Sequence, residues 1–350
     1  MKPHGFLWPL SIPYGVAVGV RNRLHDLGIF KSVHAGVPTI SVGNISAGGT
    51  GKTPFVLELI ERISKLDPRI RGKIAVVSRG YGRSTKGTEI VSDGKKIYGD
   101  PFTCGDEPFM IADNSPRTIV IVDEDRVRGA TLAVEQFKAK VLVLDDGFQH
   151  RRIKRDLDIV LLDGRNPLGN KLLLPAGFLR ESVASLARSD LIVLSKSAGD
   201  DSELAERCDR MRELTGKPVI ATRLVAKHWR RIGKAEIEGV EQVKGKRVVA
   251  FAGIANPRSF FETVEGFGSE IVAYIPLPDH CNYGKFILNK IAHSFSANRV
   301  QWLVTTEKDA SKLPPILKLL PAYALAVRQN VVVGAEVLDE MLRKTMISTS

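Results

Sequence analysis

The feature that most constrains this sequence is a glycine-rich loop placed between a short apolar run and a helical pattern. The loop reads GNISAGGTGKTP over residues 43–54, and the apolar run PTISVGN over residues 38–44 leads into it. Its glycines let backbone N–H groups turn towards phosphate oxygens, while Lys52 is suited to reach the β- and γ-phosphates and the Thr53 hydroxyl to bind Mg²⁺. The pattern therefore predicts a P-loop that binds a nucleoside triphosphate, ATP, together with Mg²⁺.

The loop departs from the usual GxxxxGK[ST] pattern at one position, where Ser46 replaces the first glycine. Neighbouring residues argue against two other P-loop classes. MinD-like ATPases carry an extra lysine where this chain has Ala47, and the string nearest to the Asn-Lys-x-Asp base reader of GTPases, at 306–309, lacks the asparagine. We expect the phosphates to lie against Ser46, Gly48, Gly49, Thr50, Gly51, Lys52 and Thr53.

Short apolar runs alternate with helical patterns from residue 38 onward, which is typical of βαβ units. The runs are rich in Val, Ile and Leu throughout their length, as in strands that are buried on both faces of a parallel sheet. Strands are expected at 38–44, 73–78, 117–123, 140–146, 157–163 and 190–195, with helices at 54–66, 125–137 and 202–214.

The composition changes near residue 225. Residues 227–241 read as a polar, hairpin-like linker, and a second α/β set follows from 247 to 329. We therefore expect an α/β fold that is P-loop NTPase-like: a doubly wound parallel sheet with a second, smaller α/β domain joined by the hairpin-like linker. The expected divisions are an N-terminal helix in 1–35, a P-loop kinase domain in 36–225, and the linker with the second domain in 226–350.

Both the overall charge and the N-terminus indicate an anionic partner. The chain has 51 Lys and Arg against 39 Asp and Glu, a formal net charge of +12, which suits nucleic acid, an acidic membrane leaflet or a phosphorylated substrate. Residues 5–20 are mostly apolar but too few to span a bilayer. Residues 12–30 fit an amphipathic helix, which either packs on its own domain or dips into a membrane surface.

A few acidic positions and one histidine carry the remaining candidate chemistry. Asp145 and Asp146 follow an apolar run, where an acid of a P-loop kinase would hold Mg²⁺, although turn-forming acids also occur there. In the string GDEP, Asp106 or Glu107 is either a helix cap or the base that takes a proton from an attacking hydroxyl. His280 is either a packed histidine or a catalytic one.

Taken in order, these strings and several others resemble the tetraacyldisaccharide 4′-kinases, the lipid A 4′-kinases of Gram-negative bacteria. The resemblance covers nearly the whole chain. It is carried by SVGNISAGGTGKTP (41–54), VVSRGYGR (76–83), GDEP (105–108), DEDRVRGA (123–130), LDDGFQHRR (144–152), LLPAGFLRE (173–181), FAGIANP (251–257), PDHCNY (278–283) and VTTEKDASKL (304–313).

The resemblance implies transfer of the γ-phosphate of ATP to the 4′-hydroxyl of a tetraacyldisaccharide 1-phosphate by a peripheral enzyme at the cytoplasmic face of the inner membrane. It implies that the N-terminal helix faces an anionic membrane surface. We also expect a monomer with no nucleic-acid partner. The implied roles are Asp106 as base or orienter of the hydroxyl with His280 as its partner, Lys52, Arg128 and Arg180 as catalytic cations, and Thr53, Asp145, Asp146 and Glu181 around Mg²⁺.

The chain departs from the family pattern at two positions. Cys281 stands where a second histidine often follows His280, and Ser182 stands where a proline often follows the string LRE. Two other functions remain as alternatives. A P-loop switch or metal-insertion chaperone would hydrolyse nucleotide without a sugar acceptor, and a nucleic-acid-binding NTPase would need a basic stripe interleaved with aromatic residues, which the sequence does not show.

Overall fold

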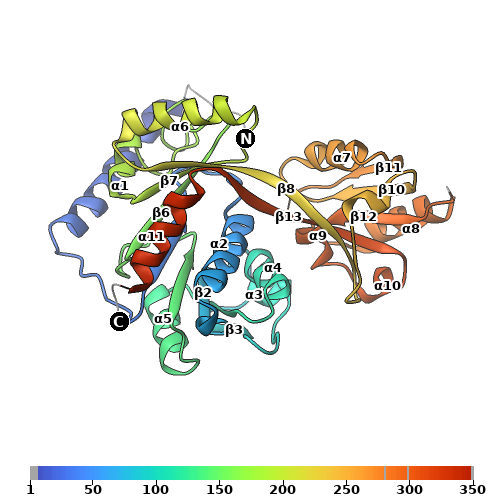
Figure 1. Ribbon diagram of the computed structural model, residues 1–350, viewed down its shortest axis with the longest axis horizontal. Coiled ribbons are helices and arrows are strands. Elements are labelled where there is room, and N and C mark those ends of the chain that lie inside the picture. The colour runs from blue at the N-terminus through green and yellow to red at the C-terminus, as the bar shows by residue number, and fades with distance from the viewer. Residues whose placement is uncertain (1–6, 280, 298, 348–350) are drawn as a thin grey trace.

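A computed structural model describes residues 7–279, 281–297 and 299–347 of the chain. One mixed sheet runs through the molecule in the order β11-β10-β12-β13-β8-β7-β6-β1-β5-β2-β4-β3, with β9 beside β8. Figure 1 shows two lobes, which we call the first unit (residues 7–218 and 334–347) and the second unit (residues 232–321). The long strands β8 and β13 run between them.

The first unit is built on parallel strands that are apolar and buried. β1 (Thr39–Gly43) lies between β5 (Val141–Asp145) and β6 (Leu157–Asp163). Their Val, Ile and Leu side chains alternate between two helix-covered faces, as the near-continuous apolar runs predict. The other strands are β2 (Ile74–Ser78), β4 (Ile119–Val122), β7 (Leu191–Ser195) and the antiparallel edge strand β3 (Glu89–Asp93).

Helices cover both faces of this sheet, so the expected doubly wound arrangement is confirmed. One face packs against α2 (Lys52–Leu66), α4 (Asp106–Asn114) and α11 (Ala335–Ile347). The opposite face packs against α5 (Arg126–Glu135) and α6 (Asp201–Thr215). Shorter helical segments are η2 (Pro68–Ile70), α3 (Pro101–Cys104) and η3 (Val183–Arg188).

The second unit also alternates strands and helices, and it is smaller than the first unit. Its parallel strands β10 (Arg247–Ala252), β11 (Glu270–Pro276) and β12 (Trp302–Thr306) separate two apolar cores. One core includes Trp229, Trp302 and side chains of α7 (Pro257–Gly266), and the other includes Ile291 of α8 (Lys285–Ala297). The remaining elements are β9 (Ile237–Glu238), η4 (Val240–Val243), α9 (Glu307–Ala310) and α10 (Pro315–Lys318).

A two-stranded antiparallel ribbon joins the two units. It consists of β8 (Val219–Arg231) and β13 (Ala322–Val333), and its register runs from Tyr323 opposite Arg231 to Val333 opposite Ala221. The division expected near residue 225 therefore falls inside β8. Because β13 carries the chain back, α11 joins the core of the first unit rather than the second unit to which residues 226–350 were assigned.

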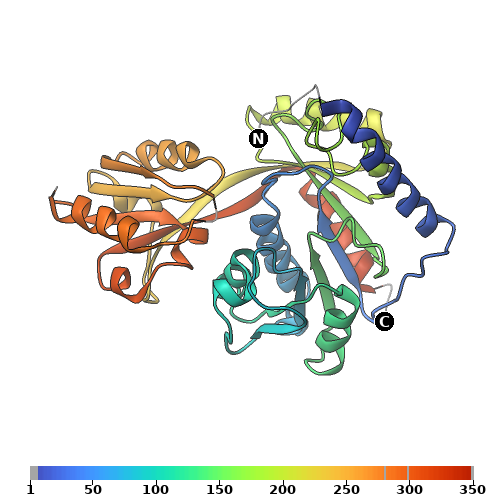
Figure 2. The same ribbon diagram turned by 180° about the vertical axis from the view of Figure 1, so that it is seen from behind.

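The N-terminal helix α1 (Trp8–Asp26) begins and ends about one turn earlier than the sequence suggested. It lies on the outside of the first unit, as Figure 2 shows, and none of its residues is buried. Trp8, Val16 and Val20 are each more than half exposed. In the described part of the chain, no helix combines the length and apolarity needed to cross a membrane.

The packing of α11 gives a direct test of this chain topology. Leu338 is fully buried against the first unit, so Leu338→Ala removes methyl groups from a closed core and is expected to lower the free energy of unfolding by about 3 kcal/mol. Val337, on the adjacent position of α11, is 38% exposed, and Val337→Ala is the matched control. The check is the urea midpoint of each variant; equal midpoints for the two variants would place α11 outside the core.

Candidate functional site

The glycine-rich loop closes around the first turn of α2. Gly51 is the residue before Lys52, the first residue of the helix, and has a left-handed backbone with φ 77°. Gly48 also has a positive φ, of 123°. These two positions let the loop turn so that backbone N–H groups and the positive end of the helix dipole face one point, which suits phosphate oxygens.

Buried polar side chains hold the loop from behind. The Nδ2 of Asn44 lies 3.2 Å from the Thr50 hydroxyl, and the Ser195 hydroxyl donates to the Thr50 carbonyl at 2.6 Å. Gln329, in β13, donates through Nε2 to the Gly51 carbonyl at 3.4 Å. A Cβ added at Gly51 would lie 2.5 Å from that same Nε2, so the close approach requires glycine. Sequence reasoning missed Ser195 and Gln329 as supports, because they come from distant strands.

Asp145 lies at the carboxyl end of β5, next to the loop. Its side chain is buried, and Oδ2 accepts a hydrogen bond from the Ser78 hydroxyl at 3.1 Å. No donor among the described residues reaches its other oxygen, Oδ1. Burial, together with the nearby carboxylate of Glu107, raises the pKa of Asp145 to about 7, although Lys52 opposes the rise. A buried carboxylate oxygen without a donor is suited to bind a cation.

Asp146 joins two cations at the same edge. Its carboxylate lies 3.3 Å from Nζ of Lys52 and 3.0 Å from a guanidinium nitrogen of Arg180. Burial opposes ionisation, but these two cations bring the pKa of Asp146 below its usual value. The structure thus brings together Lys52, Asp145, Asp146 and Arg180, four of the residues that the sequence analysis selected.

Arg126 is the arginine of this segment whose pKa responds to the charges of these carboxylates. Burial lowers the pKa of Arg126, while the charges of Asp145 and Asp146 oppose that change. Its guanidinium donates to the backbone carbonyls of Asp123 and Glu124, each at 3.4 Å. Arg128 instead makes two hydrogen bonds of 2.7 Å to the buried carboxylate of Asp123. Arg128 thus contacts Asp123 rather than Asp145 or Asp146, and its catalytic role stays a prediction. Residues two apart on a helix point in different directions, so the string DRVR could not show which arginine faces the site.

Glu181 is also placed differently from the expectation. Its buried carboxylate accepts from Asn22 at 2.8 Å and Arg21 at 3.3 Å, both in α1, and from Arg188 at 2.9 Å. With cations and an amide on its two oxygens, this carboxylate anchors α1 to the first unit, and its place around Mg²⁺ stays a prediction. The backbone next to Glu181 also contacts α1, because the Tyr14 hydroxyl donates to the Arg180 carbonyl at 2.9 Å.

Asp106 is the first residue of α4 and faces the second unit. Its Oδ2 lies 2.6 Å from Nζ of Lys312, and both side chains are largely buried, at 13% and 9% exposure. The next residue, Glu107, is the one that repels Asp145. His280, the expected partner of Asp106, lies outside the described residues.

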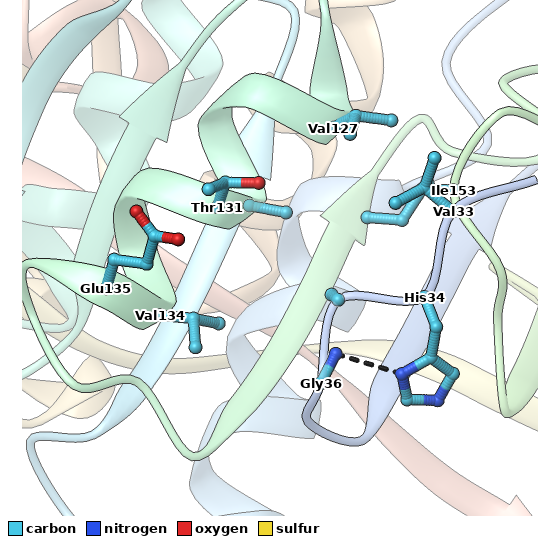
Figure 3. A pocket seen from close by; sticks show the side chains of 10 residues that line it. Val33, His34, Gly36, Val127, Thr131, Val134, Glu135 and Ile153 are labelled. Carbon is cyan, nitrogen blue, oxygen red and sulfur yellow. Dashed lines mark hydrogen bonds between the residues drawn. The ribbon is translucent and has the colours of Figure 1, made fainter.

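A pocket elsewhere on the first unit has no connection with this edge. It has a volume of about 220 Å³ and lies between residues 33–36 and α5. Figure 3 shows that apolar side chains form most of its wall, with Thr131 and Glu135 on one side and His34 on the other, where the Gly36 N–H donates to Nδ1 of His34 at 2.9 Å. None of its lining residues belongs to the phosphate loop. The convergent charged groups therefore define the candidate site.

Comparisons with known proteins identify the relatives of the whole chain. The family model described as tetraacyldisaccharide-1-P 4′-kinase matches residues 3–347. A tetraacyldisaccharide 4′-kinase of Chlorobaculum parvum is 39% identical over 98% of this chain and 94% of its own length. One of Geobacter metallireducens is 37% identical over 96% of both. The crystal structure of LpxK from Aquifex aeolicus in complex with ATP, 31% identical, superposes with a TM-score of 0.79 over 97% of this chain and 98% of that one.

His150 provides a pH test of the packing behind the site. Burial, with the nearby charge of Arg126, lowers its pKa to about 4, whereas an unfolded histidine titrates near 6.5. Between these values the unfolded chain binds a proton that the folded chain does not. The stability due to neutral His150 is therefore complete above about pH 6.5 and is lost as the pH falls towards 4.

We expect the urea midpoint of His150→Asn to fall less than that of the wild type when the pH is lowered from 7.5 to 5. His293→Asn, at an exposed position, is the control. If the pH dependence of His150→Asn equals that of the wild type, His150 is not held neutral by the fold.

Proposed function

Because the chain belongs to the tetraacyldisaccharide 4′-kinase family, it transfers the γ-phosphate of ATP to a tetraacyldisaccharide 1-phosphate, and we propose roles for its residues in that transfer. The observation that carries the proposal is the meeting of Lys52, Asp146 and Arg180 at the mouth of the phosphate loop. Two cations held by one carboxylate present a preorganised positive field to the phosphates.

The donor site is the loop 46–53 with its flanking charges. Ser46, Gly48, Gly49, Thr50 and Gly51 line the phosphates, Lys52 and Arg180 neutralise charge on them, and Arg126 adds a third cation in place of Arg128. Mg²⁺ fits this site, because Asp145 has a buried oxygen that no described residue pairs with. Thr53 and Asp145 would hold the ion, and Asp146 would act beside it through Lys52 and Arg180. The ion would supply further neutralisation of the phosphate charge.

The acceptor side is the N-terminus of α4. The 4′-hydroxyl oxygen attacks the γ-phosphorus, the bond from that phosphorus to the β,γ-bridging oxygen breaks, and ADP leaves. The hydroxyl proton passes to the carboxylate of Asp106, with His280 as the partner that orients it. The family match favours the kinase over a switch ATPase, which would have no acceptor hydroxyl to deprotonate.

We further propose that α1 binds the membrane that holds the lipid, at the cytoplasmic face of the bacterial inner membrane. Its exposed Trp8, Val16 and Val20 form an apolar surface, and Arg23 lies on the same helix to meet anionic headgroups. The charge of +12 then serves an anionic lipid surface and a phosphorylated substrate rather than nucleic acid. The enzyme acts as a monomer in this proposal.

Replacing Asp106 tests the acceptor side. Asp106→Asn keeps the shape of the side chain but removes the proton acceptor, so we expect kcat for lipid phosphorylation to fall about 100-fold or more while the KM for ATP changes little. The measurement is a steady-state rate with Mg-ATP and the lipid in detergent micelles. Wild-type kcat in Asp106→Asn would remove Asp106 from the role of base.

Charged substitutions on α1 test the membrane proposal. Val16→Glu with Val20→Glu places two carboxylates on the apolar surface, and we expect binding to vesicles with anionic lipid to weaken about tenfold or more. Leu214→Glu, at a 60% exposed leucine of α6, is the matched control. Equal sedimentation of the double variant and the wild type with the vesicles would show that α1 is not the membrane contact.

A further inference from the structure

Helix α4, which begins at Asp106, is held at both ends by basic residues from outside the first unit. At its N-terminus, Lys312 pairs with Asp106 at 2.6 Å. At its C-terminal end, Arg230 of β8 pairs with Asp113, and Arg328 of β13 donates to the Asn114 amide oxygen at 3.3 Å. We call Lys312, Arg230 and Arg328 the α4 clamp. Figure 1 shows α4 facing α9 where the two units meet.

The α4 clamp is anchored on its own side as well. Arg328 makes an ion pair of 2.8 Å with the buried carboxylate of Glu307, in α9, so its guanidinium bridges the second unit and α4. Lys312 is only 9% exposed, which shields its pair with Asp106 from water. Shielded, well-ordered pairs of this kind keep side chains in one geometry, whereas exposed pairs contribute little.

Contacts at both ends fix the direction of a helix as well as its place. A helix of nine residues is about 13 Å long. If the contact at its N-terminus is lost, a small tilt about the C-terminal end would move the first residue by an ångström or more. Misplacement of a catalytic group by about 1 Å can cost about 100-fold in rate. Asp106, the first residue of α4, is the residue that such a tilt would move most.

We propose that Lys312 is a positioning residue: together with Arg230 and Arg328 it lets the second unit set where the Asp106 carboxylate stands relative to the phosphate loop. Lys312 acts through Asp106 and does not itself bind the phosphates of ATP. This inference rests on the role proposed above for Asp106.

The test compares Lys312→Met, Lys312→Arg, Arg230→Gln and Asp106→Asn in the phosphoryl-transfer assay with lipid in micelles. Lys312→Met removes the cation, and we expect kcat to fall about 30-fold with the KM for ATP within about twofold of the wild type. Lys312→Arg keeps the charge, and we expect its kcat to lie within about threefold of the wild-type value. Lys234→Met, which alters a half-exposed lysine beside the ribbon, is the control with unchanged rates.

Wild-type kcat in Lys312→Met would overturn the proposal. A large rise in its KM for ATP with kcat unchanged would also overturn it, because Lys312 would then be a phosphate ligand. If Lys312→Met does not fold, Arg230→Gln is the deciding variant, because the Arg230 side chain is partly exposed. A severalfold loss of kcat in Arg230→Gln supports the α4 clamp, and an unchanged kcat contradicts it. Asp106→Asn distinguishes a failure of the α4 clamp from a failure of the role proposed for Asp106. If it keeps its activity, the proposed role of Asp106 as base fails as well; if it loses activity while Lys312→Met does not, only the α4 clamp fails.

Discussion

The pairing of Asp146 with both Lys52 and Arg180 is the interaction on which the rest of the site depends. It joins three separate pieces of chain: the first turn of α2, the end of β5 and the segment that carries Arg180. That segment is in turn bound to α1 through Tyr14 and Glu181. A displacement of α1 would therefore be transmitted to Lys52 in the phosphate loop through Arg180 and Asp146. This arrangement connects the exposed apolar helix with the chemistry at the sheet edge.

A second connection runs through the ribbon. Gln329 of β13 supports the Gly51 carbonyl on the donor side of the site, and Arg328, the preceding residue, contacts the end of α4 on the acceptor side. Adjacent residues of one strand point to opposite faces, so one strand can serve both halves. The ribbon thus acts as a spacer between the phosphate loop and the carboxylate that faces the acceptor.

Much of the fold could be predicted from the sequence, because its determinants are local. Near-continuous runs of Val, Ile and Leu with intervening helical periods require a parallel sheet covered on both faces. The six strands expected between 38 and 195 lie within two residues of the predicted ranges, whereas the edge strand β3 was not predicted. The glycine-rich loop also specifies its own conformation. The return of α11 to the first unit was not predictable in this way, since no local pattern shows where β13 leads.

The candidate site could be predicted only in part. Asp145 and Asp146 follow a recognisable strand, so their place at the sheet edge follows from topology. The choice between Arg126 and Arg128 depends on helix phase, which a boundary uncertain by one residue reverses. Arg21, a partner of Glu181, and Lys312, a partner of Asp106, lie far away in sequence, and only the tertiary structure brings them together.

The most direct measurement is transfer of labelled γ-phosphate from Mg-ATP to tetraacyldisaccharide 1-phosphate in detergent micelles, by the wild type and by Lys52→Ala. The account predicts that the wild type labels the lipid, and that Lys52→Ala does not, although it stays folded. ATP hydrolysis by the wild type with the lipid left unlabelled would contradict it: the phosphate loop would stand, and the acceptor would have to be a different molecule.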